Sequence, residues 1–366
     1  MNSHGRVLAA CAFEQPDRIP VVDFFWSYPD SWQDLLGPVE AATDVVIWCP
    51  NEGTFPSRAR RLRQERGYIY EIDRWGRTIR RRPGAYFSET LAVPITDETD
   101  LDRVSFEPPD LDSRFLQVEA ETVEDRSQVC ERPAPAAIQA ALRSAKQNAC
   151  LFGKTGGPYL RSTYVRGEAE FLMDIAADPA RAKALADRMA DHLAVIGVEQ
   201  IRRWDLSDTG IWIFDDIAHN FGPMFSPRTF ESVFLPAYRR MVSAFKRAGA
   251  RYVFFHSDGD IRRLLDMLID AGIDGINPVE PRANMDVVDL RRRYPNLILT
   301  GGLDNTGTLI RGPIERIEAE TRAIIDIGRD GGVIIGSGYI GPEIPLEHYA
   351  VYRRACDTYG AFAEDD

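Results

Sequence analysis

The stretch that decides the fold is "RYVFFHSDGDIRRLLDMLIDAGIDGIN", residues 251–277. Its apolar run at 252–255 is rich in β-forming residues and too short for a helix, which predicts a buried strand. The next segment, 260–272, places four aliphatic residues on one helical stripe and ends on Gly272, which predicts an amphipathic helix. Another short β-rich run follows at 273–277. The stretch therefore predicts a strand–helix–strand unit.

Runs of the same kind recur along the whole chain, and several are apolar throughout, as is typical of parallel strands covered on both faces. Helical patterns at 226–249 and 313–328 separate the later ones, and the first of these begins with Ser226 as N-cap and Pro227 in the first turn. Alternation of this kind predicts an α/β fold, a (β/α)8 TIM barrel. The eight predicted strands are 19–25, 45–49, 149–153, 210–214, 252–256, 273–277, 297–301 and 332–336.

One segment departs from this alternation. Residues 68–94 alternate apolar and polar side chains, with turn signals at Gly76 and at Pro83-Gly84. We interpret them as a small antiparallel β-hairpin inserted in a single barrel domain that spans residues 1–366. Trp75 and arginines 80–82 are interpreted as a charged, solvent-exposed hairpin edge.

Composition narrows the classes of function. The net charge of −12 argues against a nucleic-acid partner and against binding to an anionic membrane surface. No run approaches the roughly 18 apolar residues of a membrane span, and the N-terminal residues lack the apolar region of a secretory signal. Five scattered cysteines without a C-x-x-C pair predict neither a disulfide framework nor a thiolate metal cage. A cytoplasmic location is expected.

Polar side chains follow most of the predicted strands, at the end where TIM barrels build their active sites. Their convergence predicts a catalytic or metal site. Each also has a structural alternative: His256 could be a hydrogen-bonded packing residue, and Asp304 could be a turn residue. The strand-end set comprises Asp23, Trp26, Asp215, Asp216, His219, Asn220, His256, Asp258, Asp260, Glu280, Asp304, Ser337 and Tyr339.

Four segments resemble the uroporphyrinogen decarboxylase family, which also contains cobamide-dependent methyltransferases. They are "GPMFSPRTFESVFLPAYRRM" (222–241), "HSDGDIRRLLDMLIDAGIDGINPVEP" (256–281), "LTGGLDNTGTL" (299–309) and "GSGYIGPEIPLEHY" (336–349). The resemblance implies the same barrel fold. It also implies a homodimer, which is usual in this family. It implies less about the reaction, because this fold supports several chemistries.

Two departures from the family pattern narrow the reaction. True uroporphyrinogen decarboxylases carry arginines after the first strand that grip the substrate's carboxylates, whereas this chain has no Arg or Lys between Arg18 and Arg58. The methyltransferase branch binds zinc through H-x-C after the fifth strand and a second cysteine after the eighth. This chain keeps the histidine as His256, with Asp258 and Ser337 at the cysteine positions.

The missing thiolates leave two readings of the site. His256, Asp258 and Glu280 could hold zinc or another divalent metal, as a harder site than the family's thiolate set. Alternatively, His256 and Asp258 could act without a metal as a hydrogen-bonded acid–base pair on the substrate.

We expect a methyltransferase-like enzyme that moves a methyl group between a small methylated substrate and a corrinoid or folate-type acceptor. No corrinoid-binding D-x-H-x-x-G is present, so the corrinoid would come on a separate protein. Asp216, His256, Asp258 and Glu280 would be the catalytic residues. Substrate-binding side chains would be Trp26, Arg161, Tyr164, Trp212, Phe221, Asp304, Ser337 and Tyr339.

Two other hypotheses stay open at this point. One is a decarboxylase of a small or tetrapyrrole-like acid, which predicts at least one arginine in the barrel mouth, with Arg161 as the best candidate. The other is a non-catalytic ligand- or corrinoid-binding barrel.

Overall fold

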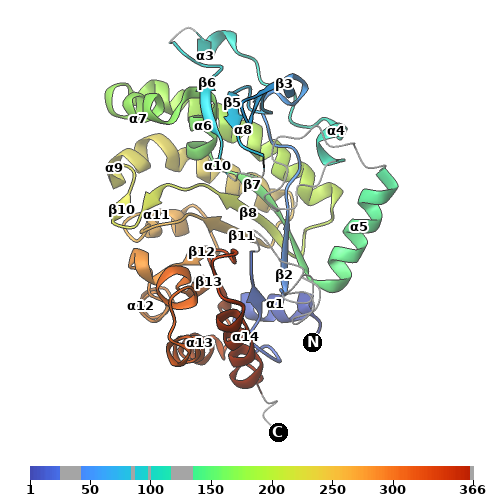
Figure 1. Cartoon of the computed structure of the whole chain (residues 1–366), viewed down its shortest axis with the longest axis vertical. Coiled ribbons are helices and arrows are strands. Elements are labelled where there is room, and N and C mark those ends of the chain that lie inside the picture. The colour runs from blue at the N-terminus through green and yellow to red at the C-terminus, as the bar shows by residue number, and fades with distance from the viewer. Residues whose placement is uncertain (25–42, 84–86, 98–99, 117–134, 363–366) are drawn as a thin grey trace.

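The computed structural model describes residues 1–24, 43–83, 87–97, 100–116 and 135–362. Its central feature is an eight-stranded sheet in the order β1-β14-β13-β12-β11-β8-β7-β2, with every neighbouring pair parallel. The two end strands are tied where the Asp44 amide donates to the Val21 carbonyl at 2.7 Å. The sheet is thus a nearly closed barrel (Figure 1), which confirms the predicted (β/α)8 TIM barrel.

The observed strands match the predicted ones closely at their buried centres. They are β1 Val21–Val22, β2 Val45–Trp48, β7 Cys150–Gly156, β8 Gly210–Phe214, β11 Tyr252–His256, β12 Gly275–Val279, β13 Ile298–Leu303 and β14 Val333–Ser337. Several strands run further toward their carboxyl ends than predicted. Some of the extra residues are small or polar, as in Thr155 and Gly156 of β7, so hydrophobicity did not mark them.

Aromatic and aliphatic side chains fill the barrel interior. The Trp212 and Phe254 rings stack at 4.6 Å between centroids, and Phe152 packs edge-on against both. Helix α1 (Ser3–Cys11) covers the end where the strands begin and adds Val7 and Cys11 to this core. With that end closed, the carboxyl ends of the strands form the mouth of the barrel.

Helices pack outside the strands. The segment predicted as one helix at 226–249 is divided into α9 Pro227–Thr229, a π-helical turn Phe230–Phe234 and α10 Leu235–Arg247. Only Leu265–Asp270 of the predicted helix 260–272 is helical, as α11. Further helices are α3 Asp100–Arg103, α4 Asp112–Phe115, α5 Pro135–Asn148, α6 Pro158–Arg166, α7 Glu168–Ala177, α8 Pro179–Arg203, α12 Val287–Arg293, α13 Ile314–Gly328 and α14 Leu346–Tyr359.

A small antiparallel sheet lies beside the barrel, next to α6 at the top of Figure 1. It has four strands in sequence order: β3 Arg60–Glu65, β4 Tyr68–Ile72, β5 Thr78–Arg81 and β6 Glu89–Ala92. The predicted hairpin, 68–94, covers three of them. Strand β3, "RRLRQE", is exposed along its whole length and lacks the alternation that marks a half-buried strand.

None of the helices in the described part of the chain is both long enough and apolar enough to cross a membrane.

A candidate active site in the barrel mouth

His256, the last residue of β11, is held in one orientation by its neighbours. Its Nδ1 lies 2.6 Å from Oδ1 of Asn277, the residue opposite it in the register with β12. The Asn277 amide nitrogen donates to the Thr300 carbonyl at 3.4 Å, which turns the amide oxygen toward His256. Nδ1 therefore carries the hydrogen. The Phe214 ring stacks on the imidazole at 4.2 Å and fixes its plane, so that Nε2 faces the mouth.

Two carboxylates stand in front of Nε2. Oδ1 of Asp216 and Oδ1 of Asp258 each lie 3.9 Å from it. Asp216 also accepts a hydrogen bond from the Asp258 backbone amide at 3.1 Å, which links the loops after β8 and β11. The ligand atoms of these three residues all lie within 4.8 Å of one another. The structure thus groups Asp216 with His256 and Asp258, whereas the sequence-based metal set contained Glu280.

Desolvation in the mouth raises the pKa of Asp258; His256 opposes this shift and the negative charge of Asp216 adds to it. The shift is surprising for a side chain with 67% of its surface exposed. The pKa is raised because the walls of the mouth exclude part of the water around this carboxyl group, and because the negative charge of Asp216 lies close by. Clustered carboxylates of this kind keep a proton at higher pH than isolated ones.

Glu280 and Tyr339 belong to the same electrostatic environment. Burial raises the pKa of Glu280, and the charge of Asp258 raises it further. Burial, a hydrogen bond with Glu343 and the charges of Asp258 and Glu280 raise the pKa of Tyr339 to about 12. The phenol of Tyr339 therefore stays protonated, with its O–H directed to Glu343.

Three other strand-end aspartates hold the fold together. Asp23 accepts hydrogen bonds from Tyr349 and Tyr352 and pairs with Arg353 at 3.2 Å. Asp215 accepts from Tyr238 and from the Tyr159 and Leu160 amides, and burial raises its pKa to about 7. Asp304 caps the following turn by accepting from the Thr306 and Gly307 amides.

The predicted substrate-binding residues Arg161 and Tyr164 lie in a second cluster under the small sheet. Arg161 forms an ion pair with buried Glu52, and its guanidinium stacks on Tyr164 at 5.1 Å and on Trp75 at 5.3 Å. Burial favours the neutral form of Glu52, but Arg161 and Lys154 outweigh it and lower the pKa. Arg161 thus has a carboxylate partner within the protein.

The remaining predicted residues occupy different layers. Trp212 is fully buried in the barrel core, below the mouth, because the inward side chains of neighbouring strands close over it. Ser337 is buried and donates to the Tyr339 carbonyl at 2.9 Å. Phe221 is 90% exposed on the loop after β8. Trp26 lies outside the described residues.

Sequence reasoning missed three residues around His256. Asn277 orients the imidazole, Phe214 stacks on it, and the Lys154 ammonium lies 4.1 Å from the centre of the Phe214 ring. A lysine inside the apolar run of β7 is a signal that the sequence did offer. The role of Asn277 needed the β11–β12 register, which no single strand pattern supplies.

The donor atoms present fit a divalent metal. One imidazole nitrogen and two carboxylate oxygens form a three-ligand set that leaves positions open for water or substrate, as in catalytic zinc sites. A metal-binding histidine commonly donates its other N–H to a neighbouring oxygen, as His256 does to Asn277. Zinc or a harder divalent ion suits this oxygen-rich set.

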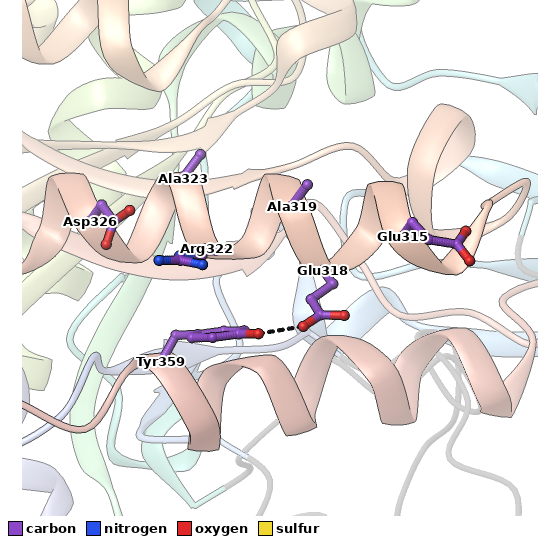
Figure 2. Close-up of a pocket in the computed structure, with 7 residues that line it drawn as sticks. All are labelled: Glu315, Glu318, Ala319, Arg322, Ala323, Asp326 and Tyr359. Carbon is purple, nitrogen blue, oxygen red and sulfur yellow. Dashed lines mark hydrogen bonds between the residues drawn. The ribbon is translucent and has the colours of Figure 1, made fainter.

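A groove of about 370 Å³ lies elsewhere, on the outer surface between α13 and α14. Figure 2 shows Tyr359 of α14 reaching across it to Glu318 of α13, with a hydrogen bond of 2.5 Å. None of the strand-end residues described above lines this groove, so it is separate from the barrel mouth.

Fold and site together define an α/β-barrel protein with a histidine–carboxylate cluster at the carboxyl ends of its strands. The family model of uroporphyrinogen decarboxylase (URO-D) matches residues 86–359, so the chain belongs to the URO-D family. No curated protein matches the chain.

Two solved structures are similar. A methyltransferase from Methanosarcina mazei has a TM-score of 0.63 at 15% sequence identity, covering 98% of this chain and 98% of that chain. This similarity confirms the barrel fold. A protein from Listeria monocytogenes, described as a vitamin-B12 independent methionine synthase, has a TM-score of 0.37 at 17% identity, covering 60% of this chain and 67% of that chain.

Proposed function

We propose that the protein is a methyltransferase-like enzyme that moves a methyl group between a small methylated substrate and a corrinoid. The observation that carries the proposal is the position of His256 Nε2, 3.9 Å from a carboxylate oxygen of both Asp216 and Asp258. Membership of the URO-D family, which we noted above includes cobamide-dependent methyltransferases, and the fold shared with the Methanosarcina mazei methyltransferase support it.

The proposed roles follow from the geometry. Asp216, His256 and Asp258 would hold a divalent metal. When bound, such a metal would polarise the oxygen or nitrogen that carries the methyl group. Asn277 and Phe214 keep Nε2 directed at the carboxylates, so the three donors are positioned before substrate arrives.

Methyl transfer from oxygen needs a proton for the leaving group. A reduced corrinoid would accept the methyl group, and the oxygen that loses the methyl group would keep the electron pair of the broken bond. Glu280 is the proposed proton donor, because its side chain is partly buried in the mouth and burial favours its protonated form. The corrinoid would be supplied by a separate protein.

The structure gives less support to a decarboxylase. That reaction predicted an arginine in the mouth ready to bind a substrate carboxylate, with Arg161 as the candidate. Arg161 is paired with Glu52 and stacked between aromatic rings. An arginine neutralised by a buried carboxylate is a weak anchor for a further anion.

The test combines metal analysis with a spectroscopic assay. Purified protein is analysed for bound metal, then mixed with cob(I)alamin and a panel of small methyl ethers and methylated amines while absorbance follows methylcobalamin formation. We expect about one divalent ion per chain and methylation by at least one donor. His256→Ala should lose both.

His4→Ala is the matched control, because His4 lies on α1 at the opposite end of the barrel and pairs with Asp208 at 2.9 Å. A His256→Ala protein that methylates cobalamin as fast as His4→Ala would overturn the proposal. So would release of carbon dioxide from a carboxylic acid without any methyl transfer.

A further inference from the structure

The charge of the chain is distributed unevenly. Residues 58–82, which form most of the small antiparallel sheet, contain ten arginines and three carboxylates, a net charge of +7. The whole chain has a net charge of −12, so the remainder carries −19. A basic surface of this size on an acidic protein attracts negatively charged partners to one place.

The register of the sheet gathers these arginines with tyrosines on one face. Arg63 of β3 pairs with Tyr70 of β4, which pairs with Arg80 of β5, so the three side chains lie in a row. The guanidinium of Arg63 stacks on Tyr70 at 4.0 Å, and that of Arg80 stacks on Tyr68 at 5.1 Å. We call this surface the arginine–tyrosine face; it consists of Arg60, Arg63, Tyr68, Tyr70, Arg80 and Arg82.

The positive charge of this face is only partly neutralised. Arg63 lies 3.4 Å from Glu65, with both side chains at least half exposed, and Arg80 pairs with Glu89 at 2.6 Å. Within the described residues, Arg60 and Arg82 have no carboxylate partner. Exposed ion pairs contribute little to stability, so these charges are not explained by a need to hold the sheet together.

Protection of a free sheet edge explains only part of the pattern. Charged side chains on an edge strand prevent pairing with other chains, and β3 is an edge strand. Strand β5, however, lies between β4 and β6, so Arg80 protects no edge. Arginine and tyrosine stacked on a central strand match the composition of protein interfaces, which are enriched in both residues.

The face stands at the mouth end of the barrel. Trp75 and Arg77, in the turn between β4 and β5, pack on Tyr164 of α6. Helix α6 begins directly after β7, and its first amides donate to Asp215 at the end of β8. The sheet is therefore fastened to the same end of the barrel that carries His256.

We propose that the arginine–tyrosine face docks an acidic protein, the separate carrier that presents the corrinoid to the barrel mouth. The proposal rests on the proposed function. Charge complementarity favours a compact acidic domain, which needs only this face. A nucleic acid is less well matched, because its backbone would extend over a remainder that carries −19 and be repelled there.

The test uses the triple variant Arg60→Glu/Arg63→Glu/Arg82→Glu. A matched control, Arg292→Glu/Arg293→Glu/Arg329→Glu, changes the charge equally in the last turn of α12 and just after α13, at the end of the barrel where strands begin. Methyl transfer is measured with free cob(I)alamin and with the corrinoid bound to an acidic carrier domain. Binding of the carrier domain is measured by biolayer interferometry at about 50 and 300 mM salt.

For the triple variant we expect kcat/KM with the carrier-bound corrinoid to fall about tenfold or more. The affinity for the carrier domain should fall by a similar factor and should no longer depend on salt, while the rate of methyl transfer with free corrinoid stays unchanged. The control variant should behave as wild type in all three measurements.

Three results would overturn the proposal: unchanged carrier binding, an equal loss with free corrinoid, or binding of a fluorescent single-stranded RNA that the triple variant alone loses. If wild type methylates no cobalamin, the proposed function fails. The binding measurement with the carrier domain then still tests whether the arginine–tyrosine face is a docking surface, because binding can be measured without any methyl transfer.

Discussion

Two groups of carboxylates stand at the ends of the barrel strands, and they differ in what surrounds them. Asp23, Asp215 and Glu52 are buried and satisfied by protein donors, such as Tyr349, Tyr238 and the Gly156 amide. Asp216 and Asp258 stand in the open mouth, facing one imidazole nitrogen. Position at a strand end is common to both groups, so position alone does not identify the site.

The difference is sharpest between Asp215 and Asp216, which are neighbours in the chain. They directly follow β8, and their side chains point to opposite sides: one carboxylate faces α6 while the other faces the mouth. The first group should therefore matter for folding and the second for chemistry. Each prediction below tests one side of that division, from the largest expected effect to the smallest.

Asp216→Asn should lower kcat/KM by about 10²–10⁴-fold, because it removes one of the three donors around the reacting group. The free energy of unfolding should stay close to that of wild type, since Asp216 is partly exposed. Steady-state kinetics and urea denaturation measure the two effects. A large loss of stability would place Asp216 with the structural carboxylates.

Asp23→Asn should have the opposite effect to Asp216→Asn, with a large loss of stability. Its side chain is fully buried beside Arg353 and accepts from two tyrosines, so neutralising it should cost about 3–5 kcal/mol of stability. Denaturant midpoints measure this loss, and Arg353→Met serves in a double-mutant cycle. A stable Asp23→Asn protein with a catalytic defect would contradict the division.

His192 tests the structural group through pH. Its Nε2 lies 3.1 Å from the Glu52 carbonyl, and burial lowers its pKa to about 4, below the unfolded value. Between these two pKa values the unfolded chain is protonated at this position and the folded protein is not. The free energy of unfolding should therefore fall by about 3 kcal/mol as the pH drops from about 6.5 toward 4.

His192→Gln keeps an N–H donor without the titration, so the slope of stability against pH should become shallower over this range. Denaturant unfolding at a series of pH values measures it, with His4→Gln as the exposed control. Equal slopes for both variants would show that folding does not lower the pKa of His192.

Asn277→Ala should have the smallest effect, about 10–100-fold on metal affinity or activity, as for other residues that orient a metal-binding histidine. Asn277→Asp, which keeps an acceptor for Nδ1–H, should recover part of the loss. Metal titration followed by calorimetry separates this from a folding defect. If the metal affinity of Asn277→Asp is as low as that of Asn277→Ala, the side-chain oxygen that accepts from His256 is not the cause of the effect.

Much of the barrel was predictable because its strands are buried on both faces and read as short apolar runs. The polar strand β3 was not, since its exposed residues carry no such signal. The alternation Trp212, Phe214, Asp216 was visible in the sequence, but only the closed barrel shows that this set points inward.

The same limit applies to side-chain partners. The sequence predicted Asp216, His256 and Asp258 as catalytic residues but chose Glu280 as the third metal ligand, whereas the structure groups Asp216 with His256 and Asp258. The sequence also predicted Arg161 in the mouth. Its ion pair with Glu52 could not be predicted, because Glu52 lies more than a hundred residues earlier in the chain. Pairings between distant segments depend on three-dimensional packing that local patterns do not encode.

Strand β1 has a consequence for how the chain assembles on the ribosome. Its only ladder partner among the described strands is β14, near the other end of the sequence. Asp44 then fastens it, through Arg6 of α1 at 2.7 Å and the Val21 amide at 2.9 Å. The contacts with Asp44 can hold the first helix and the first strand early in synthesis, but the ring of strands closes only when β14, which lies more than 300 residues later, pairs with β1.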